Sequence, residues 1–147
     1  MVRLHLGLLS MILFLSCGKS KIDRIEGPIL SEGWRYENIL LFDLRKSANE
    51  DVLIEVDHST TYPFENLYIR LGWTENPSSS QPLSIPLADD KGYWKGDCSS
   101  QKCVYQYVIS SSNEELATTL TIEQYSRDSI LADINQINVL TRPKPKK

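Results

Sequence analysis

The chain has 147 residues, with 16 Lys and Arg against 19 Asp and Glu, and a formal net charge of −3. This length is enough for one domain with its own core and too short for two. The weak acidic excess gives no electrostatic basis for binding the phosphate backbone, so we expect no nucleic-acid partner.

The first 16 residues have the pattern of an export signal. Arg3 precedes an almost wholly apolar stretch, residues 6–15, and small residues follow it. A basic start, a short apolar segment and small residues at its end are typical of a cleaved signal peptide. The apolar stretch is about half as long as the roughly 20 residues that a membrane-spanning helix needs. We therefore predict that residues 1–16 are a signal peptide and not a transmembrane anchor.

The end of this segment indicates which kind of signal it is. Residues 14–18, Phe-Leu-Ser-Cys-Gly, resemble a bacterial lipobox, although Phe14 is bulkier than the usual Leu. The cysteine thiolate is the nucleophile that accepts diacylglycerol. An ordinary secretory peptide with an incidental cysteine is the alternative. We favour lipidation of Cys17 because polar sequence begins directly after it, at Lys19. The mature chain would then carry 15 Lys and Arg against 19 Asp and Glu, a net charge of −4.

Residues 17–33 are interpreted as the lipidated N-terminus and a tether, with a first irregular strand within 19–33 as the alternative, and residues 34–141 as the folded domain. Within the domain, apolar residues recur at every second position in 52–57, 67–74 and 116–123. Such alternation is typical of strands with one buried and one wet face. Further strand candidates are 36–44, 84–87, 104–109 and 137–140, whereas 76–82 and 110–113 have loop composition. The expected helix content is at most a turn near residues 130–132.

This spacing of strands and turns predicts an all-β fold. We expect a single antiparallel β-sandwich, jelly-roll-like, with seven or eight strands. The order of the strands cannot be derived from the pattern. Residues 142–147, Arg-Pro-Lys-Pro-Lys-Lys, are interpreted as a basic disordered tail, with docking on anionic lipid or on a partner as the alternative.

The chain has three cysteines, an odd number for an exported protein. If Cys17 carries lipid, Cys98 and Cys103 remain as a pair around a turn-like spacer. An oxidising compartment favours a disulfide between them. Two free thiols and half of a zinc site are the alternatives, but no suitably spaced Cys or His completes four zinc ligands.

Catalytic side chains are scarce. His58 is the only histidine of the mature chain; Asp57 and Ser59 flank it, but sequence neighbours rarely lie as nucleophile and base. Asp89, Asp90 and Asp97 could bind calcium, but their spacing matches no known calcium loop and is more typical of a turn. We therefore expect no enzymatic activity, no metal and no cofactor.

The aromatic residues are the remaining candidates for a binding surface. Three Trp and seven Tyr residues could build a sugar platform or a protein hot spot, although most are expected in the core. Trp73 shares the apolar phase of its strand and is expected inside. Trp94, which lies between Gly92 and Gly96, is the better surface candidate.

Three segments together resemble the gliding-motility lipoprotein family called GldH. Residues 57–69 are similar to its Tyr-Pro-aromatic-x-Asn-Leu-aromatic run, and residues 86–96 to an acidic turn followed by Gly-x-Trp-x-Gly. Residues 120–124 are similar to an Ile-Glu-Gln near the end of the domain. Two features depart from the family: His58 stands where Asn is expected, and the family is not associated with a cysteine pair.

The resemblance implies a non-enzymatic accessory lipoprotein of the gliding apparatus, which works beside type IX secretion, with no small-molecule substrate. Its expected partners are the membrane, through the lipid, and other envelope lipoproteins, with Tyr62, Phe64 and Trp94 as docking residues. Surface-exposed lipoproteins of such bacteria tend to carry acidic residues after the lipidated cysteine. This chain has the basic Lys19 and Lys21 there, which favours a periplasm-facing position. The alternative function is a carbohydrate-binding or substrate-capture lipoprotein. A coplanar aromatic row on one sheet face would favour sugar, and a patch spread over loops would favour protein.

Overall fold

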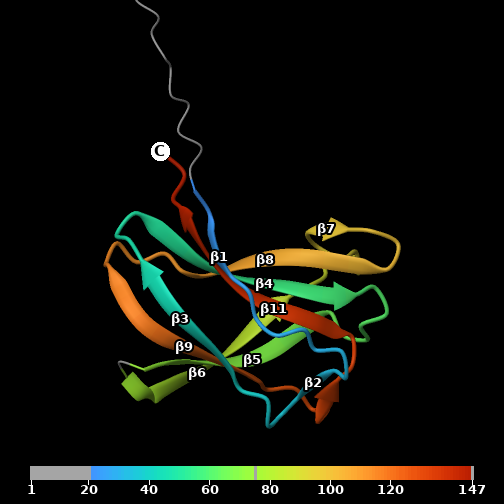
Figure 1. Cartoon of the computed structure of the whole chain (residues 1–147). Coiled ribbons are helices and arrows are strands. Elements are labelled where there is room, and N and C mark those ends of the chain that lie inside the picture. Colours follow the sequence, from blue (N-terminus) through green and yellow to red (C-terminus); the bar gives the residue numbers. More distant parts are fainter. Residues whose placement is uncertain (1–20, 75, 147) are drawn as a thin grey trace, which may run out of the picture.

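The computed structural model describes residues 21–74 and 76–146, which contain no helix (Figure 1). No segment of this part of the chain therefore qualifies as a membrane-spanning helix. The predicted signal peptide and Cys17 lie outside the described residues. The strands are β1 (Asp23–Ile25), β2 (Trp34–Arg35), β3 (Leu40–Lys46), β4 (Glu50–Ser59), β5 (Asn66–Trp73), β6 (Asn76–Pro86), β7 (Asp97–Cys98), β8 (Lys102–Ser110), β9 (Leu116–Gln124), β10 (Ile130–Leu131) and β11 (Ile134–Pro143).

The long strands form two antiparallel sheets that pack as two layers (Figure 1). The larger sheet has the order β1-β11-β4-β8-β7, the smaller has the order β3-β9-β5-β6, and β2 pairs separately with β10. The prediction of an antiparallel all-β sandwich is confirmed. Seven of the strands have at least seven residues, and the other four are pairs or triplets of residues at the margins.

β3 shows how the two-residue period builds the core. Leu40, Phe42 and Leu44 are buried, while Leu41 between them is 66% exposed. Phe42 pairs with Leu120 of β9, whose apolar phase faces the same side. The core is thus formed where the apolar phases of the two sheets meet, as expected for strands that bury one face.

β4 departs from this rule because both of its faces are buried. Its outward-facing Glu55 is only 3% exposed. The carboxylate accepts hydrogen bonds from Asn138 Nδ2 at 3.2 Å and Gln106 Nε2 at 2.9 Å, and it is paired with the Arg24 guanidinium. A buried charge is tolerated when it is paired and hydrogen-bonded, which explains an acid in the middle of the larger sheet.

A second buried charge, Lys46, connects two loops at one end of the molecule. Lys46, at the end of β3, is 4% exposed. Its ammonium group donates to the backbone oxygens of Ser47 at 3.2 Å, Ser112 at 2.9 Å and Glu114 at 2.6 Å. These bonds use all three donors of the ammonium group and connect the β3–β4 turn to the β8–β9 loop.

Strands lie on both sides of the predicted domain boundaries at residues 34 and 141. β1 lies inside the predicted tether 17–33, because its three residues pair with residues 139–141 of β11. β11 itself runs to Pro143, so the predicted tail 142–147 begins as strand. Lys144 then donates to the backbone oxygens of Ser111 and Ser112. Pairing with β11 favours the strand alternative for residues 23–25. Pairing with β4 and the hydrogen bonds of Lys144 order residues 142–144, whose composition alone indicated disorder.

The predicted loop 76–82 is also corrected, because it belongs to β6. β5 provides the template: Leu67 pairs with Ile85, and Ile69 pairs with Leu83. Once residues 83–85 are in register, the preceding residues continue the ladder back to Trp73. Proline and serine are tolerated there because β6 lies at the edge of its sheet.

Candidate functional site

The loop between β4 and β5 contains two of the three predicted docking residues. Tyr62 is 4% exposed and belongs to the core, whereas Phe64 is 40% exposed. Their ring centroids are 5.6 Å apart in an edge-to-face arrangement. Phe64 therefore lies at the surface on a buried aromatic support, which limits its freedom to move.

Phe64 forms one wall of an apolar groove of about 400 Å³, which is also lined by Asn66, Tyr68, Tyr125 and Arg127. Tyr68 is 48% exposed and Tyr125 is 51% exposed. The groove therefore presents three large aromatic side chains to solvent next to an arginine. Aromatic rings and arginine are the residue types enriched at protein-binding hot spots.

The Tyr125 side of this aromatic groove is held in place by polar contacts. The Tyr125 backbone N–H donates to Tyr68 O at 2.8 Å, and the Arg70 guanidinium lies 4.3 Å from the centre of the Tyr125 ring. The side-chain amide of the buried Gln124, the last residue of β9, donates to the backbone oxygens of Asp128 at 3.1 Å and Ser129 at 3.2 Å. These contacts hold the loop after β9 in place, so the groove is largely preformed.

The third predicted docking residue, Trp94, is half-buried and packs against the core. Its ring lies edge-on to His58, with ring centroids 4.8 Å apart, and Tyr62 lies on the same imidazole at 5.9 Å. The structure therefore brings Tyr62 and Trp94 together around His58, and Phe64 extends this cluster towards the groove.

His58 is fully buried. Its Nδ1 lies 2.9 Å from Ser59 O, to which a neutral ring would donate, and its Nε2 has no hydrogen-bond partner. Burial lowers the pKa of His58, and this outweighs the opposite effects of the Ser59 carbonyl and of Asp57 and Asp133. The imidazole is therefore neutral near pH 7.

In β4, the side chains that flank His58 in sequence point away from it. Side chains alternate across a strand, so Asp57 and Ser59 point to the face opposite His58. Asp57 is bonded to Asn135 Nδ2 at 2.9 Å and to Lys102 Nζ at 3.1 Å, and Ser59 Oγ is bonded to the Thr61 hydroxyl at 2.6 Å. None of these contacts prepares a nucleophile beside a base.

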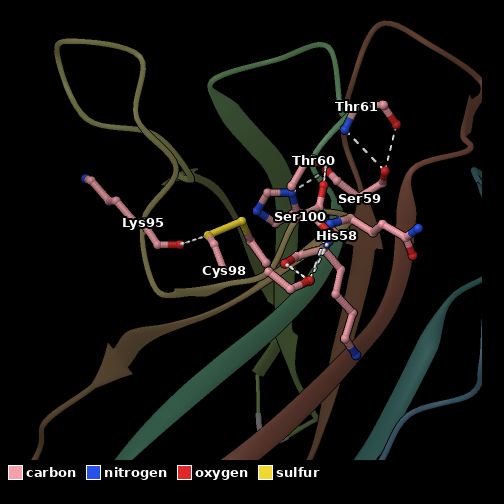
Figure 2. Close-up of a disulfide and its surroundings, with 11 residues drawn as sticks. His58, Ser59, Thr60, Thr61, Lys95, Cys98 and Ser100 are labelled. Atoms are coloured by element: carbon pink, nitrogen blue, oxygen red, sulfur yellow. Dashed lines mark hydrogen bonds between the residues drawn. A yellow bond between two sulfur atoms is a disulfide. The ribbon is translucent and has the colours of Figure 1, made fainter.

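The cysteine pair lies next to the buried histidine, as Figure 2 shows. Cys98 and Cys103 are joined by a disulfide, with Cα atoms 4.1 Å apart, and Cys103 is paired with His58 across β4 and β8. Ser99 N donates to Lys102 O at 2.8 Å and closes the intervening turn. The disulfide uses both thiols, so the zinc alternative for this pair is removed.

Asp89, considered above as a calcium ligand, serves the turn that precedes Trp94. One carboxylate oxygen accepts the backbone N–H groups of Lys91 and Tyr93, both at 2.9 Å. Gly92 completes this turn with a φ of 82°, a conformation that residues with a side chain rarely adopt. No cluster of three or more metal-ligating side chains occurs in the part of the chain that the structure describes.

The three segments that carry the family resemblance meet at this end of the sandwich. Segment 57–69 contacts segment 86–96 through His58 and Trp94, and the end of segment 120–124 supports the groove that Tyr68 lines. The model of the GldH lipoprotein family matches residues 26–139. The chain belongs to the GldH lipoprotein family. No curated protein matches the chain in a sequence comparison.

Membership of the GldH family indicates a gliding-motility-associated lipoprotein anchored in the cell envelope. The family is not a known family of enzymes. Sequence reasoning missed Tyr68, Tyr125 and Arg127 as surface residues. Tyr68 carried a usable signal, because it lies in the polar phase between the apolar Leu67 and Ile69. Tyr125 and Arg127 lie in the loop after β9, where no alternation in the sequence indicates which side chains are exposed.

Proposed function

We propose that this protein is an accessory component of the motility and secretion-associated machinery that acts by binding other envelope proteins. The family match supports the assignment to this machinery, and the aromatic groove between β5 and the loop after β9 supports the binding role. The groove offers exposed rings on a rigid support, which is the composition of a protein hot spot.

The proposal assigns direct contact to Phe64, which is exposed, and a supporting role to Tyr62 and Trp94, which are buried or half-buried. Truncating an aromatic anchor in the centre of an interface typically costs about 2 kcal/mol or more of binding, roughly a 30-fold loss of affinity. Truncating a supporting ring lowers stability as well as binding.

Anchoring through lipid on Cys17 completes the proposal. A bare domain would not remain on a membrane, while two or more acyl chains give stable attachment. The basic residues Lys19 and Lys21 support a periplasm-facing position. Binding partners would then be other lipoproteins or membrane proteins on the same side of the envelope.

Carbohydrate binding is the second candidate, because exposed aromatic rings also stack on sugars and the groove includes the polar Asn66. The rings come from two loops and one strand instead of a row on one sheet face: Phe64 precedes β5, Tyr68 lies within it and Tyr125 follows β9. This distribution favours a protein partner.

The test is co-purification of envelope proteins with the tagged, lipidated chain from its own membranes. Phe64→Ala and Tyr68→Ala should both lower partner recovery while the melting temperature stays unchanged. Leu41→Ala on β3 is the matched control, because Leu41 is an exposed apolar residue outside the groove. Unchanged recovery with both groove variants would reject protein binding there, and retention on envelope polysaccharide would favour the sugar alternative.

A further inference from the structure

β8 has an open edge in the middle of its length. β7 covers its beginning, where Asp97 pairs with Val104 and Cys98 with Cys103, and Gly96 before β7 lies against Tyr105. Beyond Val104, no described strand pairs with that side of β8. At the other end, the register to β4 shifts after Val108, which leaves Ile109 as a bulge. β7, with Gly96 before it, and this bulge therefore delimit the open stretch, residues 106–108.

The turn before β8 shows which backbone groups face this open side. Lys102 O accepts from Ser99 on the β7 side, whereas Gln101 O accepts from Thr60 on the β4 side. Backbone groups alternate in direction along a strand, so those of Gln106 and Val108 face away from β4. Within the described residues, these groups have no strand partner.

The open stretch, Gln-Tyr-Val, contains no charge, proline or glycine. Long neutral edges invite pairing with another chain, and proteins usually block them with charges, prolines or short edge strands. The other edges show these devices: β6 contains Pro82 and Pro86, β3 contains Asp43 and Arg45, and β1 has three residues. The open stretch of β8 ends at a bulge but contains neither a charge nor a proline.

We propose that the open edge of β8 pairs antiparallel with β8 of a second copy of this chain. A two-fold axis at Tyr107, the centre of the open stretch, places Gln106 opposite Val108 of the other copy and forms backbone hydrogen bonds at both pairs. The stretch is neutral, so identical copies meet without charge repulsion. The half-buried rings of Tyr105 and Tyr107, at the margin of the core, become covered. This inference is independent of the aromatic groove.

The first test compares self-association of full-length lipidated chains that carry two different tags, solubilised from membranes in mild detergent. Wild-type chains should recover each other. Val108→Pro removes an outward-facing N–H at an edge position, which a strand tolerates, and should lower recovery at least about tenfold with little change in melting temperature. Val108→Thr keeps the N–H and is the matched control. Wild-type chains that do not recover each other, or full recovery with Val108→Pro, would overturn the proposal.

The second test reads the register without a proline. Gln106 and Val108 are exposed. Gln106→Cys removes one partner of the buried Glu55 and leaves Asn138 and Arg24, so the melting temperature of each cysteine variant is measured first. Oxidising a mixture of Gln106→Cys and Val108→Cys chains should give a cross-linked dimer of the two variants, because paired Cα atoms about 5.5 Å apart can form a disulfide. Each variant alone should cross-link much less. Equal cross-linking in all three samples would reject this register, whereas loss of partner proteins from the groove would leave it untouched.

Discussion

The buried His58 should make the stability of this domain fall as the pH is lowered below about 6.5. Burial lowers its pKa in the folded state, whereas in the unfolded chain the pKa returns to its ordinary value near 6.5. Below pH 6.5 the unfolded state therefore binds more protons than the folded state. The free energy of unfolding should be constant above this pH and fall as the pH falls below it.

The size of the effect follows from one proton. Where the unfolded chain carries a protonated imidazole and the folded chain a neutral one, the free energy of unfolding changes by about 1.4 kcal/mol per pH unit. The fall continues until the lowered pKa of the folded state is reached. His58 is the only histidine after the predicted signal peptide, and ordinary carboxylates titrate near pH 4, so a single group dominates this window.

The assay is urea unfolding of the mature chain, followed by tryptophan fluorescence, at half-unit steps from pH 8 to pH 5.5. His58→Leu is the matched variant, because leucine fills the site without a titrating group. It should remove the dependence on pH. A wild-type stability that stays flat down to pH 5.5, or an equal slope in His58→Leu, would refute the assignment of a buried neutral imidazole.

Three further predictions concern the anchor, the disulfide and the buried lysine. Cys17→Ala should abolish acylation, so that the chain no longer partitions into the detergent phase or stays on membranes after alkaline washing; retention would contradict lipid anchoring. Alkylation of the unreduced exported protein should leave Cys98 and Cys103 unmodified, and the Cys98→Ser, Cys103→Ser double variant should lose about 2 kcal/mol of stability in urea unfolding; two alkylated thiols would contradict the bond. Lys46→Met should lower the free energy of unfolding by about 1–3 kcal/mol, because it deprives three backbone oxygens of their donor; a change below about 0.5 kcal/mol would show that water replaces the ammonium group.

The fold class could be derived from the sequence because it depends on a local period. In β5 the alternation of Leu67, Ile69 and Leu71 with Tyr68, Arg70 and Gly72 predicts a strand with one buried face, whatever lies opposite. The same reasoning found most of the long strands. Strand order could not be derived in this way, since β4 lies between β11 and β8, which are distant in sequence, and alternation carries no information on partners.

For the candidate site, too, the features that depend on residue type could be predicted, whereas burial could not. The pattern at Cys17, the pairing of Cys98 with Cys103 and the low prospect of catalysis depend on residue type and spacing, and could be argued from the chain alone. Burial could not: Tyr62 and Phe64 are two residues apart in one aromatic loop, yet one belongs to the core and the other lines the groove.

The sequence by itself determined the all-β class and the membership of a lipoprotein family, because both rest on local patterns and motifs. Only the tertiary structure decided which aromatic rings reach solvent and how Tyr125 comes to lie beside Tyr68. It also showed that Glu55 and Lys46 are buried with partners from distant strands and loops. The physical reason is that burial and hydrogen bonding are set by what packs against a residue, and those neighbours come from other parts of the chain.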